Sequence, residues 1–252
     1  VSYLNEIYRC EIKKKVVSSA GDEFQGLFFD LQSAFLYIRK LQILIYPIKI
    51  RSGIGYGEIK YDVEEWESSA FDGEAYYLAR DAITAIKGKK SNTICFNTKS
   101  RYDKYLNEFC MADMSVKSRQ SQVAHLIELI ADIMLPMVYK EEDAQFYYFI
   151  AKKKSRWIEQ ERWNKSSSRY RDVKVLDVDY DSLFWIREEY VKKEEPKLMF
   201  CMDEFWARGM STKIAQVMHT TRQNIDRYVS LGRIKESRTM DKAIFELLGE
   251  DI

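Results

Sequence analysis

The sequence predicts an α+β protein in which a mixed first part, residues 1–100, is followed by an all-helical half. Short apolar runs bounded by glycine or acidic turns, which are typical of strands, occur before residue 100 and almost vanish after it. The 252 residues include only 10 Gly and 3 Pro, so few residues interrupt helices. We divide the helical half into a connecting region at 101–198 and a C-terminal domain at 199–252.

The first part is expected to begin with a helix, a hairpin and a second helix. Apolar residues at helical spacing favour a helix over residues 1–15. Two apolar runs flank the polar turn Gly21-Asp22-Glu23, and this pattern is typical of a β-hairpin. Asp30 is then the expected N-cap of a helix over residues 31–45. A strand at 48–59, a helix at 75–86 and a strand at 93–96 complete this part.

After residue 100 the apolar residues recur with the helical period. The run Lys165-Ser-Ser-Ser-Arg169 is the best candidate for a linker. Helices are expected at residues 102–110, 121–138, 142–163, 182–195, 199–208, 212–218, 221–231 and 241–248.

Composition excludes several classes of protein. Lys and Arg total 40 and Asp and Glu total 39, which excludes a chain that is basic throughout, such as a simple nucleic-acid coat protein, and an acidic tail protein. The balance conceals local excesses, with seven basic and two acidic residues in 208–238 and nine basic and three acidic in 152–174. The four cysteines and two histidines are scattered, which argues against a zinc site or a disulfide framework and favours the reducing cytoplasm. No apolar run approaches the roughly 20 residues that a membrane span requires.

Two adjacent carboxylates, Asp22 and Glu23, occupy the expected hairpin turn. Carboxylate oxygens are preferred ligands of Mg²⁺, which usually takes one or two of them together with substrate phosphates. A metal held in this way can orient a polyphosphate and activate an attacking hydroxyl. The turn therefore predicts a magnesium and nucleotide site with Asp22 and Glu23 as metal ligands. The alternative is that both residues are ordinary solvated turn residues.

Glycines and an arginine further along the chain extend this candidate site. Gly53, Gly55 and Gly57 leave one side of a strand without side chains, so that a ligand can approach the backbone. A bulge, or a strand packed tightly on a helix, is the alternative. Tyr76 and Arg80 share one face of the next helix, where Arg80 can contact phosphate oxygens or form an ordinary ion pair.

The order of these segments resembles the SatD family of bacterial proteins. The resemblance rests on Gly-Asp-Glu-Phe-Gln-Gly at 21–26, on Ile-Arg-x-Gly-Ile-x-x-Gly-Glu, and on the run from Asp72-Gly73 to Arg80. It also extends, more distantly, to the ferredoxin-like palm domain of class III nucleotidyl cyclases and GGDEF-type diguanylate cyclases.

The resemblance implies roles for the matching residues. Asp22 takes the place of a metal carboxylate, with Glu23 adjacent, and Arg80 that of a phosphate-binding arginine, so these three are the catalytic candidates. Gly21 and Asp72 join the nucleotide-binding candidates, whereas Tyr76 stands where cyclases have asparagine. Cyclases carry a second metal aspartate on a strand before the first helix, and we expect this chain to begin inside that helix and not to catalyse. Pairing of cyclase palms implies a homodimer.

Residues 203–234 resemble the helix-turn-helix of phage repressors. Ile214, Ala215, Val217 and Ile225 form the expected inner face, and His219 stands at a turn position that is often glycine. In that group the first residues of the second helix enter the major groove. Their side chains suit phosphates and base edges, and the DNA-binding candidates are Thr221, Arg222, Gln223, Asn224 and Arg227. The alternative is a helical module that contacts protein instead of DNA.

We therefore expect a cytoplasmic SatD-like regulator that combines a Mg²⁺- and nucleotide-binding palm with a DNA-binding helix-turn-helix. Two other functions stay open at this stage. One is a nucleotidyl cyclase or signal-nucleotide synthase that acts by two-metal phosphoryl transfer. The other is a catalytically degenerate module that binds other proteins.

Overall fold

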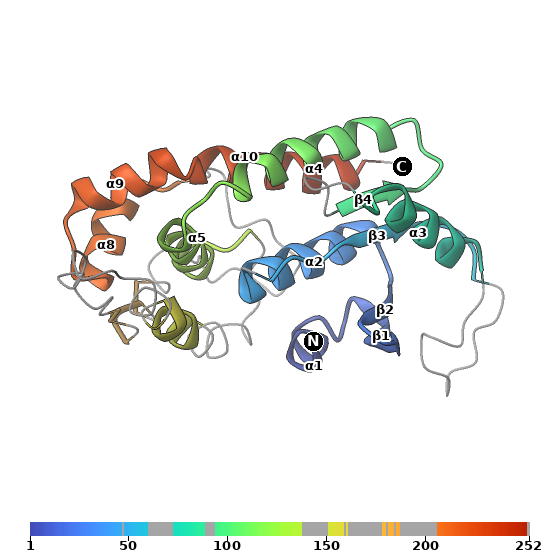
Figure 1. Ribbon diagram of the computed structural model, residues 1–252, viewed down its shortest axis with the longest axis horizontal. Helices are drawn as coiled ribbons and strands as arrows, with labels where there is room; N and C mark the ends of the chain where they lie inside the picture. The colour runs from blue at the N-terminus through green and yellow to red at the C-terminus, as the bar shows by residue number, and fades with distance from the viewer. Residues whose placement is uncertain are drawn as a thin grey trace. The chain divides into compact units, whose positions relative to one another are not determined.

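The computed structural model confirms a mixed α+β protein. It describes residues 1–46, 48–59, 73–88, 94–137, 151–158, 160, 178–179, 181–183, 185–186 and 206–250. The chain divides into two compact units (Figure 1). Unit 1 comprises Val1–Ser118 together with Thr239–Ile252, and unit 2 comprises Arg119–Arg238.

Unit 1 begins with a short helix and a hairpin. Helix α1 covers Ser2–Ile7, and strands β1 (Ile12–Ala20) and β2 (Glu23–Phe28) pair antiparallel around the predicted turn. The helix expected over residues 1–15 is thus wrong beyond Ile7. The buried Asn5 amide donates to the Val16 carbonyl oxygen (2.9 Å) and accepts from the Val16 N–H (3.1 Å), so the chain has to reverse between them. Local apolar spacing does not reveal this contact.

Helix α2 agrees with the prediction in both length and cap. It covers Leu31–Ile45, and the Asp30 side chain accepts a hydrogen bond from the Ser33 N–H at 2.6 Å. Its buried face includes Phe35, Leu36 and Tyr37. Helix α2 packs against strand β2 of the hairpin and against the next strand of the chain, β3 (Ser52–Gly55) (Figure 1).

A parallel strand pair with one crossover helix follows. Strands β3 (Ser52–Gly55) and β4 (Ile94–Asn97) are connected through α3 (Glu74–Ala85), which packs on both strands. The strand expected at 48–59 is shorter than predicted, and among the described residues beyond it Ile59 forms an isolated bridge to Gly73. Among the described residues the two strand pairs form separate sheets. Helix α4 (Asp103–Lys117) covers β4 and is longer than expected.

Unit 2 is helical in its described residues. Helix α5 (Gln122–Met134) is buried on all sides, as expected of a central helix, and the Ser121 side chain caps it. Residues 151–158 are also helical. The helices expected at 182–195 and 199–208 lie mostly outside the described residues. Helices α8 (Met210–Val217) and α9 (Arg222–Leu231) follow and pack against α5.

The last helix belongs to both units. Helix α10 covers Ile234–Leu248, so it begins seven residues earlier than the helix expected at 241–248. The division between the units falls inside it, after Arg238. In the described part of the chain no helix combines the length and the apolar character that crossing a bilayer requires.

Candidate functional site

Helices α8 and α9 are joined by a tight turn. The backbone of His219 has a φ of 45°, in the left-handed region that favours glycine. The Thr220 N–H donates to the Ala215 carbonyl oxygen (2.9 Å), which closes the turn onto α8. Thr221 then caps α9, since its hydroxyl accepts from the Asn224 N–H at 3.2 Å. These bonds fix where α9 begins.

The inner face of this helix pair is apolar, as predicted. Ile214, Val217 and Ile225 are at most 1% exposed, and small Ala215 is buried with them. The helices pack on each other and on α5. The pair is therefore a packed support for the residues that α9 presents outward.

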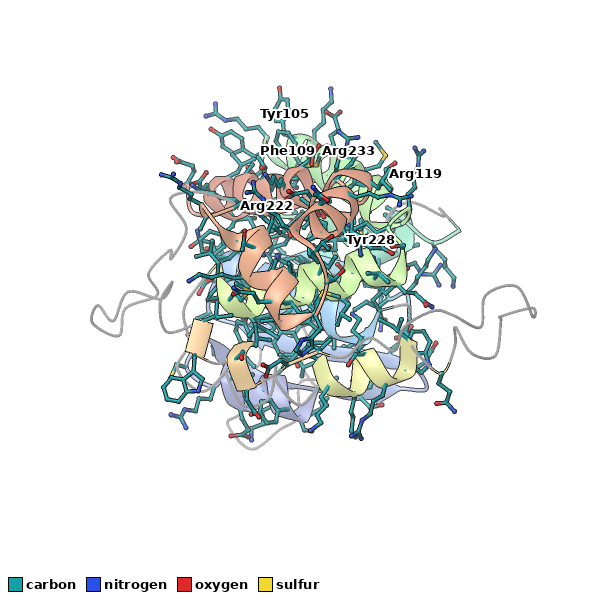
Figure 2. All side chains as sticks on the ribbon, turned by 90° about the vertical axis from the view of Figure 1, so that its left-hand side faces the viewer. Tyr105, Phe109, Arg119, Arg222, Tyr228 and Arg233 are labelled. Atoms are coloured by element: carbon teal, nitrogen blue, oxygen red, sulfur yellow. The ribbon has the colours of Figure 1, made fainter. Side chains whose placement is uncertain are left out.

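The outward residues at the start of α9 are all exposed. These are Thr221, Arg222, Gln223, Asn224 and Arg227. The Arg222 side chain is 70% exposed and lies 3.3 Å from the Asp226 carboxylate, one turn further along (Figure 2). The first turn of α9 contains no acidic residue, so its backbone dipole and N–H groups favour an anion there. The arrangement suits a phosphate backbone with base edges beside it.

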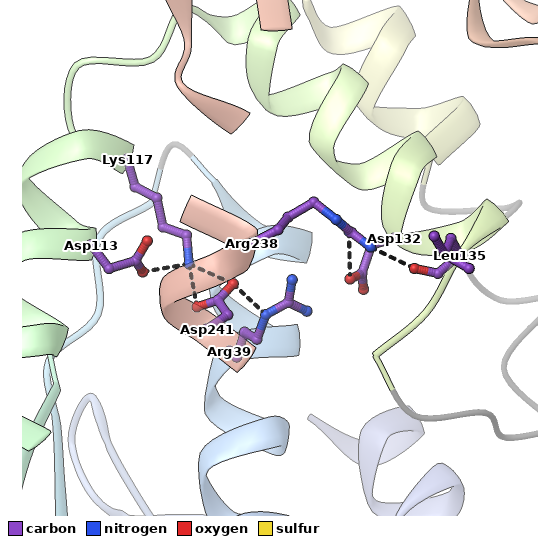
Figure 3. Close-up of polar contacts among 7 residues, drawn as sticks. All are labelled: Arg39, Asp113, Lys117, Asp132, Leu135, Arg238 and Asp241. Atoms are coloured by element: carbon purple, nitrogen blue, oxygen red, sulfur yellow. Dashed lines mark hydrogen bonds and ion pairs between the residues drawn. The ribbon is translucent and has the colours of Figure 1, made fainter. Parts of the chain in front are cut away.

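Further basic side chains of unit 2 are exposed, but one predicted contributor is not. Arg208, Arg233 and Lys235 lie at the surface, and the Lys235 amine stands 5.6 Å over the Trp206 ring. Arg238 is completely buried, where it contacts the Asp132 carboxylate (3.3 Å) and the Leu135 carbonyl oxygen (2.6 Å) (Figure 3). Of the seven basic residues counted over 208–238, Arg238 therefore adds no positive charge to the surface.

The predicted metal ligands lie at the tip of the hairpin. Gly21 has a φ of 60°, and Asp22 and Glu23 are both exposed. Among the residues that the structure describes, no three His, Cys, Asp or Glu side chains lie together as a metal site. The turn thus offers two carboxylates, a set that fits Mg²⁺ only when other ligands such as phosphates complete its shell.

The glycines of β3 are explained by packing on α3. A β-carbon at Gly53 or Gly55 would fall onto backbone atoms of α3, among them the Ala79 carbonyl oxygen and the Ala79 nitrogen. Gly57 differs, because the three atoms nearest to a β-carbon there all belong to the side chain of Glu74. Close strand–helix packing therefore accounts for Gly53 and Gly55, and their assignment to nucleotide binding stays a prediction.

Near Gly57 the structure adds an ion pair that sequence reasoning missed. The Glu74 carboxylate pairs with the Lys99 amine. The pKa of Glu74 lies below its usual value. The main cause is Lys99, through its hydrogen bond and its positive charge, and a hydrogen bond from the Glu58 N–H adds to the effect. Lys99 has a φ of 60°, which no local signal indicated.

The remaining nucleotide candidates lie on α3 or outside the described residues. Tyr76 is half-buried and Arg80 is exposed, one turn apart on the same helix. Asp72 lies outside the described residues. The hairpin tip and α3 belong to the same unit.

A buried ion cluster in unit 1 is the second feature that sequence reasoning missed. Arg39 and Asp241 contact each other at 2.5 Å, and Lys117 contacts both Asp241 and Asp113. A signal was present on α4, since Asp113 and Lys117 continue the inward series of Leu106 and Cys110. Charged residues at core positions indicate a buried partner.

These observations define an α+β protein with a hairpin-bearing first unit and a helical unit that presents α9. The model of the SatD family matches residues 1–167, and the chain therefore belongs to the SatD family. The matched residues end before α8. No curated protein and no solved structure matches the chain significantly.

Proposed function

We propose that the chain is a DNA-binding member of the SatD family and that α9 reads DNA as the second helix of a helix-turn-helix. The observation that carries this proposal is the exposed, polar start of α9, placed by a tight turn after α8. Its residues are exposed, whereas the buried side chains of α9 are those of Ile225 and Val229. Exposed Arg, Gln, Asn and Thr with no carboxylate in the first turn can donate hydrogen bonds to phosphates and to base edges.

Each proposed contact has a chemical reason. An arginine such as Arg222 can bind guanine through two hydrogen bonds, and Gln223 or Asn224 can bind adenine in the same way. Thr221 and Arg227 suit phosphate oxygens, which position the helix in the groove. Arg222 can exchange its surface contact with Asp226 for a base or phosphate at little cost, since an exposed pair contributes less than about 1 kcal/mol.

Selection from sheared genomic DNA tests the proposal with the whole protein. We expect recovered fragments to share a sequence and to bind more tightly than random fragments by about 10³-fold or more. The affinity should fall steeply with salt, because bound phosphates release counterions. Two protected half-sites one helical turn apart would indicate the homodimer that we also propose. Recovery of unrelated fragments, or no binding even at low salt, would overturn the DNA-binding proposal.

A second candidate function is Mg²⁺-dependent nucleotide binding by a palm-type unit 1. The exposed pair Asp22 and Glu23 on a glycine turn favours it, together with the resemblance of this segment to cyclases. Asp22 and Glu23 would hold the metal, and Arg80 would contact a phosphate. Bound Mg²⁺ would neutralise phosphate charge at the turn.

Calorimetric titration with ATP and with GTP, in Mg²⁺ or Mn²⁺, tests this second function. We expect metal-dependent binding that weakens at least about tenfold in Asp22→Ala, because one of two carboxylate ligands is lost. Glu108→Ala, which removes an exposed carboxylate from α4, should bind like the wild type. We expect no pyrophosphate release. Equal binding by wild type and Asp22→Ala would remove the hairpin turn from the proposal.

A further inference from the structure

Unit 1 is built from two segments that are far apart in the chain. The chain leaves this unit after Ser118 and returns to it at Thr239. Lys117 lies just before the exit and Asp241 just after the return, and their side chains are in contact. The two points of unit 1 at which the chain leaves and returns are therefore side by side.

A buried cluster of four charges joins these points (Figure 3). The Asp241 carboxylate contacts the Arg39 Nε at 2.5 Å and accepts two hydrogen bonds from the Lys117 Nζ, at 2.9 and 3.1 Å. Lys117 also contacts the Asp113 carboxylate at 2.6 Å. The four side chains are at most 9% exposed. Two cations and two anions balance, so the cluster carries no net charge.

The members of the cluster depend on one another. Burial acts to raise the pKa of Asp241, but the charges and hydrogen bonds of Arg39 and Lys117 outweigh it and hold that pKa below its usual value. The carboxylate therefore stays ionised at neutral pH. Removal of one partner leaves uncompensated charge away from water, which is much more costly than loss of an exposed pair.

The end of α10 has a second attachment in unit 1. The Gln32 side chain of α2 donates to the Phe245 carbonyl oxygen at 2.9 Å. Ile244, Phe245 and Leu248 are buried. Gly249 leaves room for Gln32, since a β-carbon there would lie 2.5 Å from the Gln32 Nε2. The segment is thus held along its length and not only at Asp241.

We propose that residues 239–248 are a strap that closes unit 1, with Asp241 as its clasp. The family match covers the first segment of unit 1 and the beginning of unit 2, so unit 1 is complete only with a segment that lies beyond the matched residues. The strap exists whether or not α9 binds DNA.

Hydrogen exchange measured by mass spectrometry on the full chain tests the strap. In Asp241→Asn we expect amides of residues 241–248 and of α2 to exchange at least tenfold faster, while α8 and α9 keep their wild-type rates. The matched control is Glu246→Gln on the same helix, which removes an exposed carboxylate and its ion pair with the half-buried Lys242 and should change neither segment. Faster exchange confined to residues 241–248, with α2 unchanged, would overturn the proposal.

The wild type gives a second measurement that does not depend on a variant folding. Exchange is followed at increasing urea concentrations. We expect residues 241–248 to open in the same step as α2, as parts of one cooperative unit. Opening of residues 241–248 at distinctly lower urea than α2 would show that the segment only rests on unit 1, and the strap would be rejected.

Discussion

Replacing Gly55 by alanine is expected to destabilise unit 1 by more than about 3 kcal/mol. The new β-carbon would lie closer to the Ala75 carbonyl oxygen and the Ala79 nitrogen of α3 than van der Waals contact allows. Both are helix backbone atoms, which cannot move aside as a flexible side chain can. The strand and the helix would have to separate, with loss of the packing that buries Ile54 and Leu78.

Urea unfolding with hydrogen exchange at α3 and β3 measures this effect. The matched control is Gly57→Ala, whose β-carbon would lie nearest to side-chain atoms of Glu74, and the loss should be about 1 kcal/mol because a side chain can move aside. Equal midpoints for Gly55→Ala and the wild type would contradict the packing of β3 on α3. Equal losses for both variants would show that glycine itself, and not the close helix, determines the result.

Features with a local cause could be predicted from the sequence. Asp30 before an apolar periodic run indicated the start of α2, and the helix expected at 221–231 begins within one residue of α9. A glycine between two apolar runs indicated the hairpin turn. In each case the residues that determine the structure lie close together in the chain, so their pattern can be recognised from one sequence.

Features with a distant cause could not be predicted. Nothing near Arg39 indicates that its partner is Asp241, at the other end of the chain. The end of α1 depends on Asn5 binding the backbone of Val16 across the turn into β1. For this reason the local spacing of apolar residues predicted a helix that extends beyond the true end of α1.

The candidate sites also differ in whether a local or a distant cause determines them. The start of α9 could be predicted because inner and outer residues of one helix follow a fixed spacing. The glycines of β3 admitted two interpretations, a ligand or a helix against the strand, and only the position of α3 distinguishes them. Glycines in a strand indicate that something lies close to the backbone, but they do not indicate whether it is a ligand or a helix.

Replacing Arg222 by alanine is expected to weaken specific DNA binding by about 10- to 100-fold. One guanine contact with two hydrogen bonds contributes about 1–3 kcal/mol, and tenfold in affinity corresponds to about 1.4 kcal/mol. The fold should survive, because Arg222 is 70% exposed and loses only a surface pair with Asp226. Reduced affinity with unchanged thermal stability would assign the effect to DNA contact.

The most direct test of DNA reading by α9 is fluorescence anisotropy with the fragment that the wild type selects. Wild type, Arg222→Ala and Arg156→Ala are compared at one salt concentration. Arg156 is an exposed arginine on the helix at 151–158, so this control removes the same charge elsewhere in unit 2. We predict that Arg222→Ala loses at least tenfold in affinity and that Arg156→Ala stays within about twofold. Wild-type affinity in Arg222→Ala, or an equal loss in Arg156→Ala, would contradict DNA reading by α9.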